Sequence, residues 1–184
     1  AACSLIWVRS YGSVGDDIGY SLSYHVDGAK VYLCGSGGGS VSSQPYYGNI
    51  DFVVVKVDAQ TGTQEWARSH GGSGEDSCSR IIFSSLYNMV VATGRVTGSL
   101  YDEFNIGDLT TTTVVHDEAG NLKGIEMHGV VQRDTSGALH VTGSGYSLFV
   151  GGTTSGSMDG QFLTSGQDGY LRKLPLSSIL KYVD

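Results

Sequence analysis

One stretch of this chain occurs twice, as WVRSYGSVGDD at residues 7–17 and as WARSHGGSGED at residues 66–76. An offset of 59 aligns the tryptophan, the arginine, the serine, two glycines and the final aspartate of the two copies. Self-similarity at a fixed period is the signature of repeat architectures, in which each unit packs on its neighbours. The repeated stretch therefore predicts a stack of similar units.

The repeat continues beyond this stretch. In the same register VYLCG (31–35) aligns with VVATG (90–94), and a third copy at an offset of 58 places Asp76 on Asp134. A chain of 184 residues is long enough for one domain with a sizeable core. The expected single domain, residues 1–184, has three units at about residues 7–65, 66–123 and 124–181.

The composition favours strands over helices. The chain has 28 Gly and only 2 Pro, with runs of Thr and Val such as TTTTVV (110–115). Each unit reads as a strand near the tryptophan, a Gly-Asp turn, two strands, a Gly/Ser loop and a Lys-bearing strand. Four-stranded units that bury their faces by stacking are typical of β-propeller blades. We therefore predict an all-β fold of three four-stranded blades of about 59 residues, within a larger or oligomeric ring.

The repeated motifs resemble a known family. GSVGDD (12–17), GGSGED (71–76) and GQDGYLRKL (166–174) are similar to the SBBP repeats of seven-bladed β-propellers, which combine GGSGDD, a YVTG-like strand, a TSGS-like loop and a DxFVxK-like strand. VDAQTGTQEW (57–66) resembles the AxDxxTGxxxW docking motif of quinoprotein-type blades. The resemblance implies blade-to-blade packing and brings with it no catalytic residue and no cofactor.

The third unit departs from this pattern. Gly124 stands where the first two units have tryptophan, and Gln132 and Arg133 replace the glycine-acid pair. We therefore expect the inner turn of this unit to be distorted or specialised.

The repeated residues suit structural roles. Trp7 and Trp66 are large enough to act as wedges between packed sheets. Asp17, Asp76 and Asp134 suit turns, where aspartate accepts hydrogen bonds from backbone amides. Two adjacent acids per turn are too few oxygen ligands for a calcium ion, so turn stabilisation is favoured over a metal site.

Charge and cysteine usage limit the partners. A formal net charge of -7 without a Lys/Arg cluster argues against nucleic acid. No run approaches the roughly 18 apolar residues of a membrane-spanning helix, so no transmembrane segment is expected. Cys3, Cys34 and Cys78 lack CxxC spacing, which disfavours zinc and favours small buried side chains whose pairing is open. The compartment is unknown, with an extracytoplasmic one (secreted, periplasmic or organelle lumen) favoured.

Aromatic residues gather in two loops that the repeat aligns. Tyr46 and Tyr47 lie in QPYYGN (44–49), and Tyr101 and Phe104 lie before the corresponding strand of the second unit. Aligned loops of adjacent blades project from the same side of a ring, so these four side chains are candidates for a shared binding patch for carbohydrate or protein. Local packing at blade edges is the competing interpretation.

No catalytic constellation is recognisable. The chain lacks a GxSxG elbow and a GK[ST] phosphate loop, and its histidines have no visible nucleophile beside them. Three units cannot close a ring of about four to eight blades, so either the chain is part of a longer protein, or a second copy or a partner protein completes the ring. The leading hypothesis is a non-catalytic scaffold or protein-interaction subunit. The alternatives are a lectin-like propeller and a segment of a propeller enzyme such as a quinoprotein.

Overall fold

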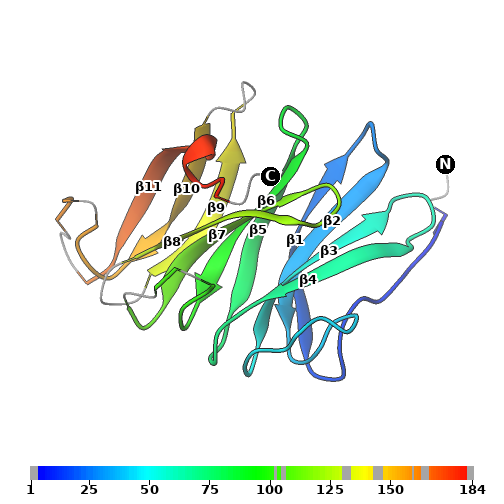
Figure 1. Cartoon of the computed structure of the whole chain (residues 1–184), viewed down its shortest axis with the longest axis horizontal. Helices are drawn as coiled ribbons and strands as arrows, with labels where there is room; N and C mark the ends of the chain where they lie inside the picture. Colours follow the sequence, from blue (N-terminus) through cyan, green and yellow to red (C-terminus); the bar gives the residue numbers. More distant parts are fainter. Residues whose placement is uncertain are drawn as a thin grey trace.

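The computed structural model describes residues 4–101, 103–104, 107–129, 134–142, 147–158, 160–162 and 166–181. The described chain is all-β, as predicted, and forms three antiparallel sheets followed by one turn of 3-10 helix (Figure 1). Across these ranges no helix is both long and apolar enough to cross a membrane.

Each sheet contains strands that follow one another in the chain. Sheet 1 contains β1 (Asp17–His25), β2 (Lys30–Gly37), β3 (Asp51–Asp58) and β4 (Gln64–His70). Sheet 2 contains β5 (Ser77–Ser84), β6 (Met89–Val96), β7 (Thr110–Asp117) and β8 (Leu122–His128). Sheet 3 contains β9 (Asp134–Val141), β10 (Ser147–Thr154) and β11 (Asp168–Pro175), followed by the helical turn η1 (Leu176–Ser178). Sheet 3 thus has three strands in the described part of the chain, where the sequence predicted four.

The sheets are offset by one strand from the sequence units. Trp66 lies in β4, so the first strand of the second unit is the last strand of sheet 1. Residues 4–12, here the N-terminal segment, form no strand and run beside sheet 1 (Figure 1). A strand needs a neighbour for its backbone hydrogen bonds. In the repeat this segment corresponds to the outer strand of a neighbouring sheet, and it has no strand partner among the described residues.

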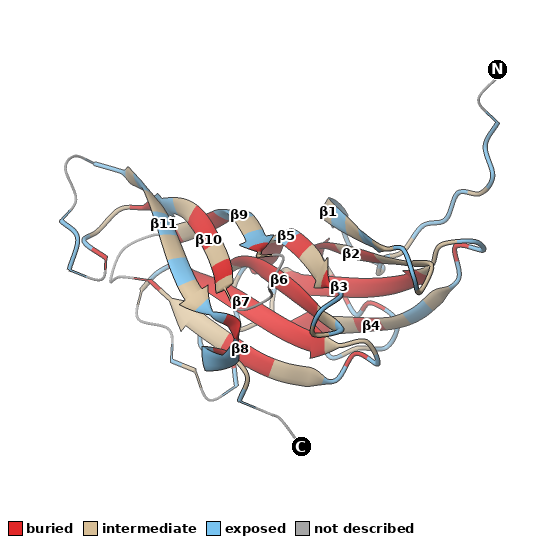
Figure 2. Cartoon of the chain, turned by 90° about the horizontal axis from the view of Figure 1, so that it is seen from above, coloured by how far each residue is buried: buried red, intermediate tan, exposed pale blue. Residues whose placement is uncertain are grey.

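The three sheets stack in chain order. β5 packs against β1, β2 and β3, and β9 packs against β5, β6 and β7, so the first strands of the three sheets are neighbours. The sheets spread like a fan and form no closed ring (Figure 1). Buried residues concentrate in the middle strands, such as β3, β6 and β7 (Figure 2). The arrangement resembles stacked propeller blades, because sheet 2 packs against sheet 1 on one face and against sheet 3 on the other.

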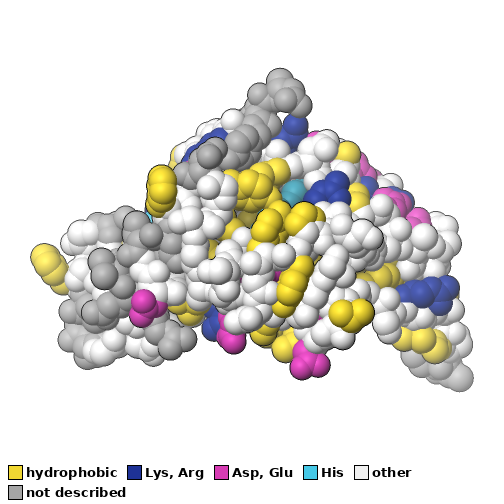
Figure 3. Space-filling model, turned by 60° about the horizontal axis from the view of Figure 1, so that its bottom comes forward, with side chains coloured by type: hydrophobic (Ala, Val, Ile, Leu, Met, Phe, Trp, Pro, Cys, Tyr) yellow, Lys and Arg dark blue, Asp and Glu magenta, His cyan; other side chains and the backbone are white. Residues whose placement is uncertain are grey.

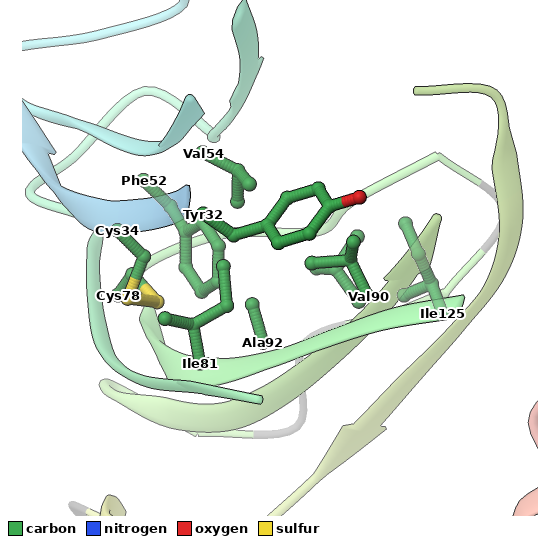
Figure 4. Packing of buried hydrophobic residues seen from close by; sticks show 10 residues of the cluster. Tyr32, Cys34, Phe52, Val54, Cys78, Ile81, Val90, Ala92 and Ile125 are labelled. Atoms are coloured by element: carbon green, nitrogen blue, oxygen red, sulfur yellow. A yellow bond between two sulfur atoms is a disulfide. The ribbon is translucent and has the colours of Figure 1, made fainter. Parts of the chain in front are cut away.

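The largest part of the core lies between sheets 1 and 2. Tyr32, Phe52 and Val54 of sheet 1 pack with Ile81 and Val90 of sheet 2 (Figure 4). Fully burying an aliphatic or aromatic side chain contributes about 1.5–3 kcal/mol relative to exposure. Packing between these two sheets therefore contributes substantially to the stability of the fold.

A disulfide crosses this core. Cys34 of β2 and Cys78 of β5 are bonded, with their Cα atoms 5.6 Å apart. The sequence left cysteine pairing open, and Cys3 lies outside the described residues. The repeat places Thr93 and Ser136 at the same position between sheets 2 and 3, where their hydroxyl oxygens lie 3.1 Å apart. The same point of two successive interfaces thus carries a covalent bond and then a hydrogen bond.

One glycine position of the repeat has a steric explanation. Gly35, Gly94 and Gly152 sit opposite irregularities in the first strand of each sheet. A Cβ atom at these positions would lie 1.9, 2.0 and 1.7 Å from a backbone carbonyl oxygen of that strand. Only glycine permits this close approach of two backbones.

The C-terminal segment, residues 176–181, returns to sheet 2. Leu176 and Ile179 are buried between sheets 2 and 3, and Leu180 forms a β-bridge with Gly124 of β8. A Cβ atom on Gly124 would lie 1.9 Å from the Ile179 carbonyl oxygen. The segment therefore occupies the space that a tryptophan side chain would need, which accounts for glycine at this position. Gln132 and Arg133, the other departure of the third unit, lie outside the described residues.

Candidate functional site

Trp66 fastens sheet 1 to sheet 2. Its indole Nε1 donates to the Glu118 carbonyl oxygen at 3.0 Å, in the turn between β7 and β8. Gly120, with φ of 84°, lets the ring approach this turn, since a Cβ atom there would lie 2.9 Å from the indole. Arg68 Nε donates to the Gly120 carbonyl oxygen at 2.7 Å. The outer strand of one sheet thus grips a turn of the next sheet.

Trp7 makes the same contact one sheet earlier. Its Nε1 donates to the Ala59 carbonyl oxygen at 3.1 Å, in the turn between β3 and β4. Gly62, with φ of 72°, lies against the ring, and Tyr11 Oη donates to the Gly62 carbonyl oxygen at 2.7 Å. The N-terminal segment therefore sits against sheet 1 as β4 sits against sheet 2.

The three repeated aspartates lie at the first strand of each sheet. Asp76 accepts hydrogen bonds from the amides of Gly72 at 2.7 Å and Thr97 at 2.6 Å, and Asp17 accepts one from Ser13 at 2.7 Å. Asp134 is buried at the start of β9. The described residues contain no group of three or more His, Cys, Asp or Glu that would suit a metal ion.

One face of sheet 1 is open to solvent over β1 and β2, whereas Val55 and Ala67 of β3 and β4 on the same face are buried in a cluster against which Tyr11 packs. This open face carries Leu22 and Tyr24 of β1 and Leu33 of β2, with Leu22 65% exposed. The repeat places Ile81 of sheet 2 at the position of Leu22, and Ile81 is 6% exposed because it packs against sheet 1. A cavity of about 460 Å³ lies on the open face between β1, β2 and the N-terminal segment.

The molecular surface is sparsely charged. Most of the surface in Figure 3 is neither charged nor hydrophobic, and hydrophobic side chains gather across its middle. Exposed apolar side chains are not confined to the open face, since Leu5, Ile6 and Val8 of the N-terminal segment are also exposed. Clustered exposed apolar side chains mark interaction surfaces more often than scattered ones do.

A second cavity, of about 340 Å³, lies in the groove between sheets 1 and 2. Two buried histidines line it, with His70 Nε2 and His116 Nε2 3.0 Å apart and His70 Nδ1 3.2 Å from Tyr101 Oη. Burial, assisted by the nearby Arg68 charge, lowers the pKa of His70 to about 3, and burial lowers the pKa of His116 well below its ordinary value. Both rings are therefore neutral near pH 7, and one donates the hydrogen bond between them.

The structure separates the four predicted binding aromatics into two groups. Tyr47 and Tyr101 both line the inter-sheet groove. Tyr46 donates its hydroxyl hydrogen to the Asn49 carbonyl oxygen within its own loop, and Phe104 is 81% exposed. The aligned loops thus bring two of the four side chains together.

Sequence reasoning missed His70, His116 and Arg68 as groove residues. His70 directly follows the repeated Trp-x-Arg-Ser stretch, and His116 follows the Thr/Val run of β7. Neither position is special within one unit, since the two rings meet only because sheets 1 and 2 stack. Prediction of the stacking offset would have been needed to find them.

Comparisons with known proteins add no relative. No protein-family model matches the chain, and no curated protein matches its sequence. The open face, the N-terminal segment and the inter-sheet groove are therefore the features of the molecule that bear on its function.

Proposed function

We propose that this chain is a non-catalytic, propeller-type interaction subunit that associates through the open face of sheet 1. The observation that carries the proposal is the contrast between Leu22, which is 65% exposed, and its repeat counterpart Ile81, which is 6% exposed against sheet 1. The repeat position of Leu22 is thus used for sheet-to-sheet packing elsewhere in the chain, at Ile81. An apolar sheet face that repeats an internal interface favours association with another sheet.

The resemblance to SBBP propeller repeats supports the same role. Blades of such rings pack face to face, and in the described part of the chain the outer faces of sheets 1 and 3 have no further sheet packed on them. The Cys34–Cys78 disulfide favours an extracytoplasmic location, because disulfides persist mainly in oxidising compartments. The proposed subunit therefore acts outside the cytoplasm, where it contributes sheets to a larger assembly.

Light scattering at several concentrations tests the proposal. We expect a mass above 19.4 kDa that rises with concentration, and a weaker association for Leu22→Asp. Loss of about 1.5–3 kcal/mol of apolar burial corresponds to at least roughly a tenfold higher dissociation constant. Leu86→Asp is the matched control, because Leu86 is 58% exposed but lies in the β5–β6 turn. A monomer at all concentrations, with no partner recovered from the native source, would contradict the proposal.

Carbohydrate binding is a second candidate function. The observation that favours it is that Tyr47 and Tyr101 line one groove, where a sugar ring can stack on an aromatic side chain and bond to polar neighbours. Binding to a glycan array should be lost in Tyr47→Ala and Tyr101→Ala but kept in Phe104→Ala, whose side chain lies outside the groove. Equal binding by all three variants would remove this candidate.

A further inference from the structure

The N-terminal segment occupies the position of an outer strand but belongs to none of the three described sheets. Trp7 and Trp66 donate to carbonyl oxygens at equivalent turns, Ala59 and Glu118, so residues 7–11 correspond to β4. β4 pairs with β3 along its length, whereas the N-terminal segment has no strand partner among the residues that the structure describes. Its side chains Leu5, Ile6 and Val8 are 79%, 87% and 70% exposed. An exposed apolar segment in this position is suited to pairing with the edge of another sheet.

Sheet 3 has the complementary feature. Its edge strand β11 pairs with β10 on one side only in the described part of the chain. In sheet 1 the corresponding strand, β3, is covered by β4. The C-terminal segment does not take this place, because it turns away and pairs with β8 at Gly124. In the described part of the chain, sheet 3 therefore has no outer strand beside β11.

Resting on the proposed function, we infer that the partner is a second copy of this chain, bound head to tail. The N-terminal segment of one copy pairs antiparallel with β11 of the other and becomes the fourth strand of its sheet 3. The register of Trp66 opposite Lys56 predicts Trp7 of one copy opposite Lys173 of the other. The outer face of that sheet 3, formed by Phe149, Leu171 and Lys173, then covers the open face of sheet 1.

The outer face of sheet 3 repeats a detail of the face of sheet 1 that meets sheet 2. Lys56 Nζ lies 5.9 Å from the centre of the Tyr32 ring, and Lys173 Nζ lies 5.8 Å from the centre of the Phe149 ring. In the internal interface Lys56 donates to the Glu118 carbonyl oxygen at 3.0 Å. The head-to-tail contact places the Ala59 carbonyl oxygen at the corresponding point for Lys173.

The disulfide position also has counterparts in the repeat on the two outer faces of the stack. The repeat aligns Cys34 and Thr93 with Gly151 on the outer face of sheet 3, and Cys78 and Ser136 with Gly19 on the open face of sheet 1. A Cβ atom on Gly19 meets nothing within 4 Å, and one on Gly151 would lie 3.3 Å from its nearest neighbour, the Tyr170 carbonyl oxygen. Both positions therefore accept a small side chain, and the inferred contact brings them together.

Two copies related by a two-fold axis make this contact twice. Each copy contributes one open sheet-1 face, one N-terminal segment and one three-stranded sheet 3. Closed point-group symmetry removes every uncovered end, whereas a contact that does not close produces filaments. The inferred assembly is therefore a closed pair in which both sheet-3 edges are completed by exchanged strands.

Disulfide trapping tests the inference. In a Cys3→Ser background, the double variant Gly19→Cys with Gly151→Cys should form a covalent dimer under mild oxidation, seen on a non-reducing gel. Each single variant should stay uncrosslinked. Gly19→Cys with Gly166→Cys is the matched control, because a Cβ atom on Gly166 also meets nothing within 4 Å but that residue lies outside the inferred contact.

The outcomes separate the inference from the proposed function. A dimer trapped by Gly19→Cys alone would mean that two open sheet-1 faces meet each other, which overturns the head-to-tail arrangement but keeps the interaction role. Association by light scattering without trapping of the double variant overturns the inference in the same way. A wild-type chain that stays monomeric overturns the inference, and it overturns the proposed function as well when no partner is recovered from the native source. Ala59→Glu supplies a second test, because an acid opposite Lys173 should tighten the head-to-tail pair by roughly tenfold, as charge-assisted hydrogen bonds do.

Discussion

Cys34 and Cys78 join β2 of sheet 1 to β5 of sheet 2 across the core between these sheets, 44 residues apart in the chain. A cross-link that closes a loop of this size restricts the unfolded chain and stabilises the folded state by about 4 kcal/mol in the chain-entropy model. It also fixes the stacking offset of the two sheets, because its two ends belong to different sheets.

Removal of this disulfide should destabilise the protein. The double variant Cys34→Ala with Cys78→Ala is expected to lose about 2–4 kcal/mol of unfolding free energy, measured by urea denaturation. Cys3→Ser serves as the control, since it removes a cysteine and leaves the cross-link intact. An unchanged midpoint in the double variant would mean that the cross-link restricts little in the unfolded chain.

A second disulfide is predicted at the next interface. Thr93 and Ser136 occupy the corresponding positions between sheets 2 and 3, with their hydroxyl oxygens 3.1 Å apart. Thr93→Cys with Ser136→Cys should oxidise to a bond and raise the unfolding free energy by about 2 kcal/mol. Mass spectrometry checks the bond, and the reduced double variant is the reference. Persistent free thiols in the folded protein would show that the two interfaces are not equivalent in geometry.

Gly124 should not tolerate a side chain. In Gly124→Ala the new Cβ atom would meet the Ile179 carbonyl oxygen at 1.9 Å, so the C-terminal segment must move. We expect a loss of about 1–3 kcal/mol, the usual cost of overpacking, and faster proteolysis of residues 176–181. Gly137→Ala is the matched control, since its Cβ atom meets nothing within 4 Å. Equal proteolysis of both variants would place the segment away from β8.

The pH dependence of stability should differ in sign between two aspartates. Burial, opposed by the Tyr47 amide and assisted by the charge of Asp76, raises the pKa of Asp51 above 3.8. The carboxyl group of Asp51 therefore binds its proton more tightly in the folded state than in the unfolded state. As a result, the contribution of Asp51 to stability falls as the pH rises through its raised pKa. Asp51→Asn should therefore gain stability relative to the wild type as the pH rises above 3.8, measured by urea denaturation at a series of pH values.

Asp58 provides the opposite case. The hydrogen bond from the Thr61 amide, with help from Lys30, lowers its pKa to about 2. Its contribution to stability is present above 3.8 and is lost as pH falls toward about 2, so Asp58→Asn should be less stable than the wild type only above this window. Parallel pH profiles for the two variants would contradict these assignments.

Much of the fold follows from local sequence. Periodic glycines, β-branched runs and the recurring tryptophan predict an all-β repeat, and the structure has three successive antiparallel sheets. The offset of one strand between the sheets and the sequence units was not predictable. Trp66 begins the second sequence unit but lies in β4, the last strand of sheet 1. A repeat period has no intrinsic starting point, so sheet boundaries depend on which turn is open and which strands pair.

The candidate site was less predictable than the fold. Tyr47 and Tyr101 were expected to share a surface because the repeat aligns their loops, and both line the inter-sheet groove. His70 and His116 join them there through contacts between residues 46 positions apart. Such contacts depend on the stacking distance and rotation of two sheets, which no local pattern specifies.

The sequence by itself determined the strand type and the repeat, since these depend on side-chain shape and backbone freedom within one unit. Only the tertiary structure decided the Cys34–Cys78 pairing, the return of the C-terminal segment to Gly124 and the absence of an outer strand from the described part of sheet 3. These features arise from contacts between sheets. Their free energy depends on surfaces that exist only after each sheet has formed.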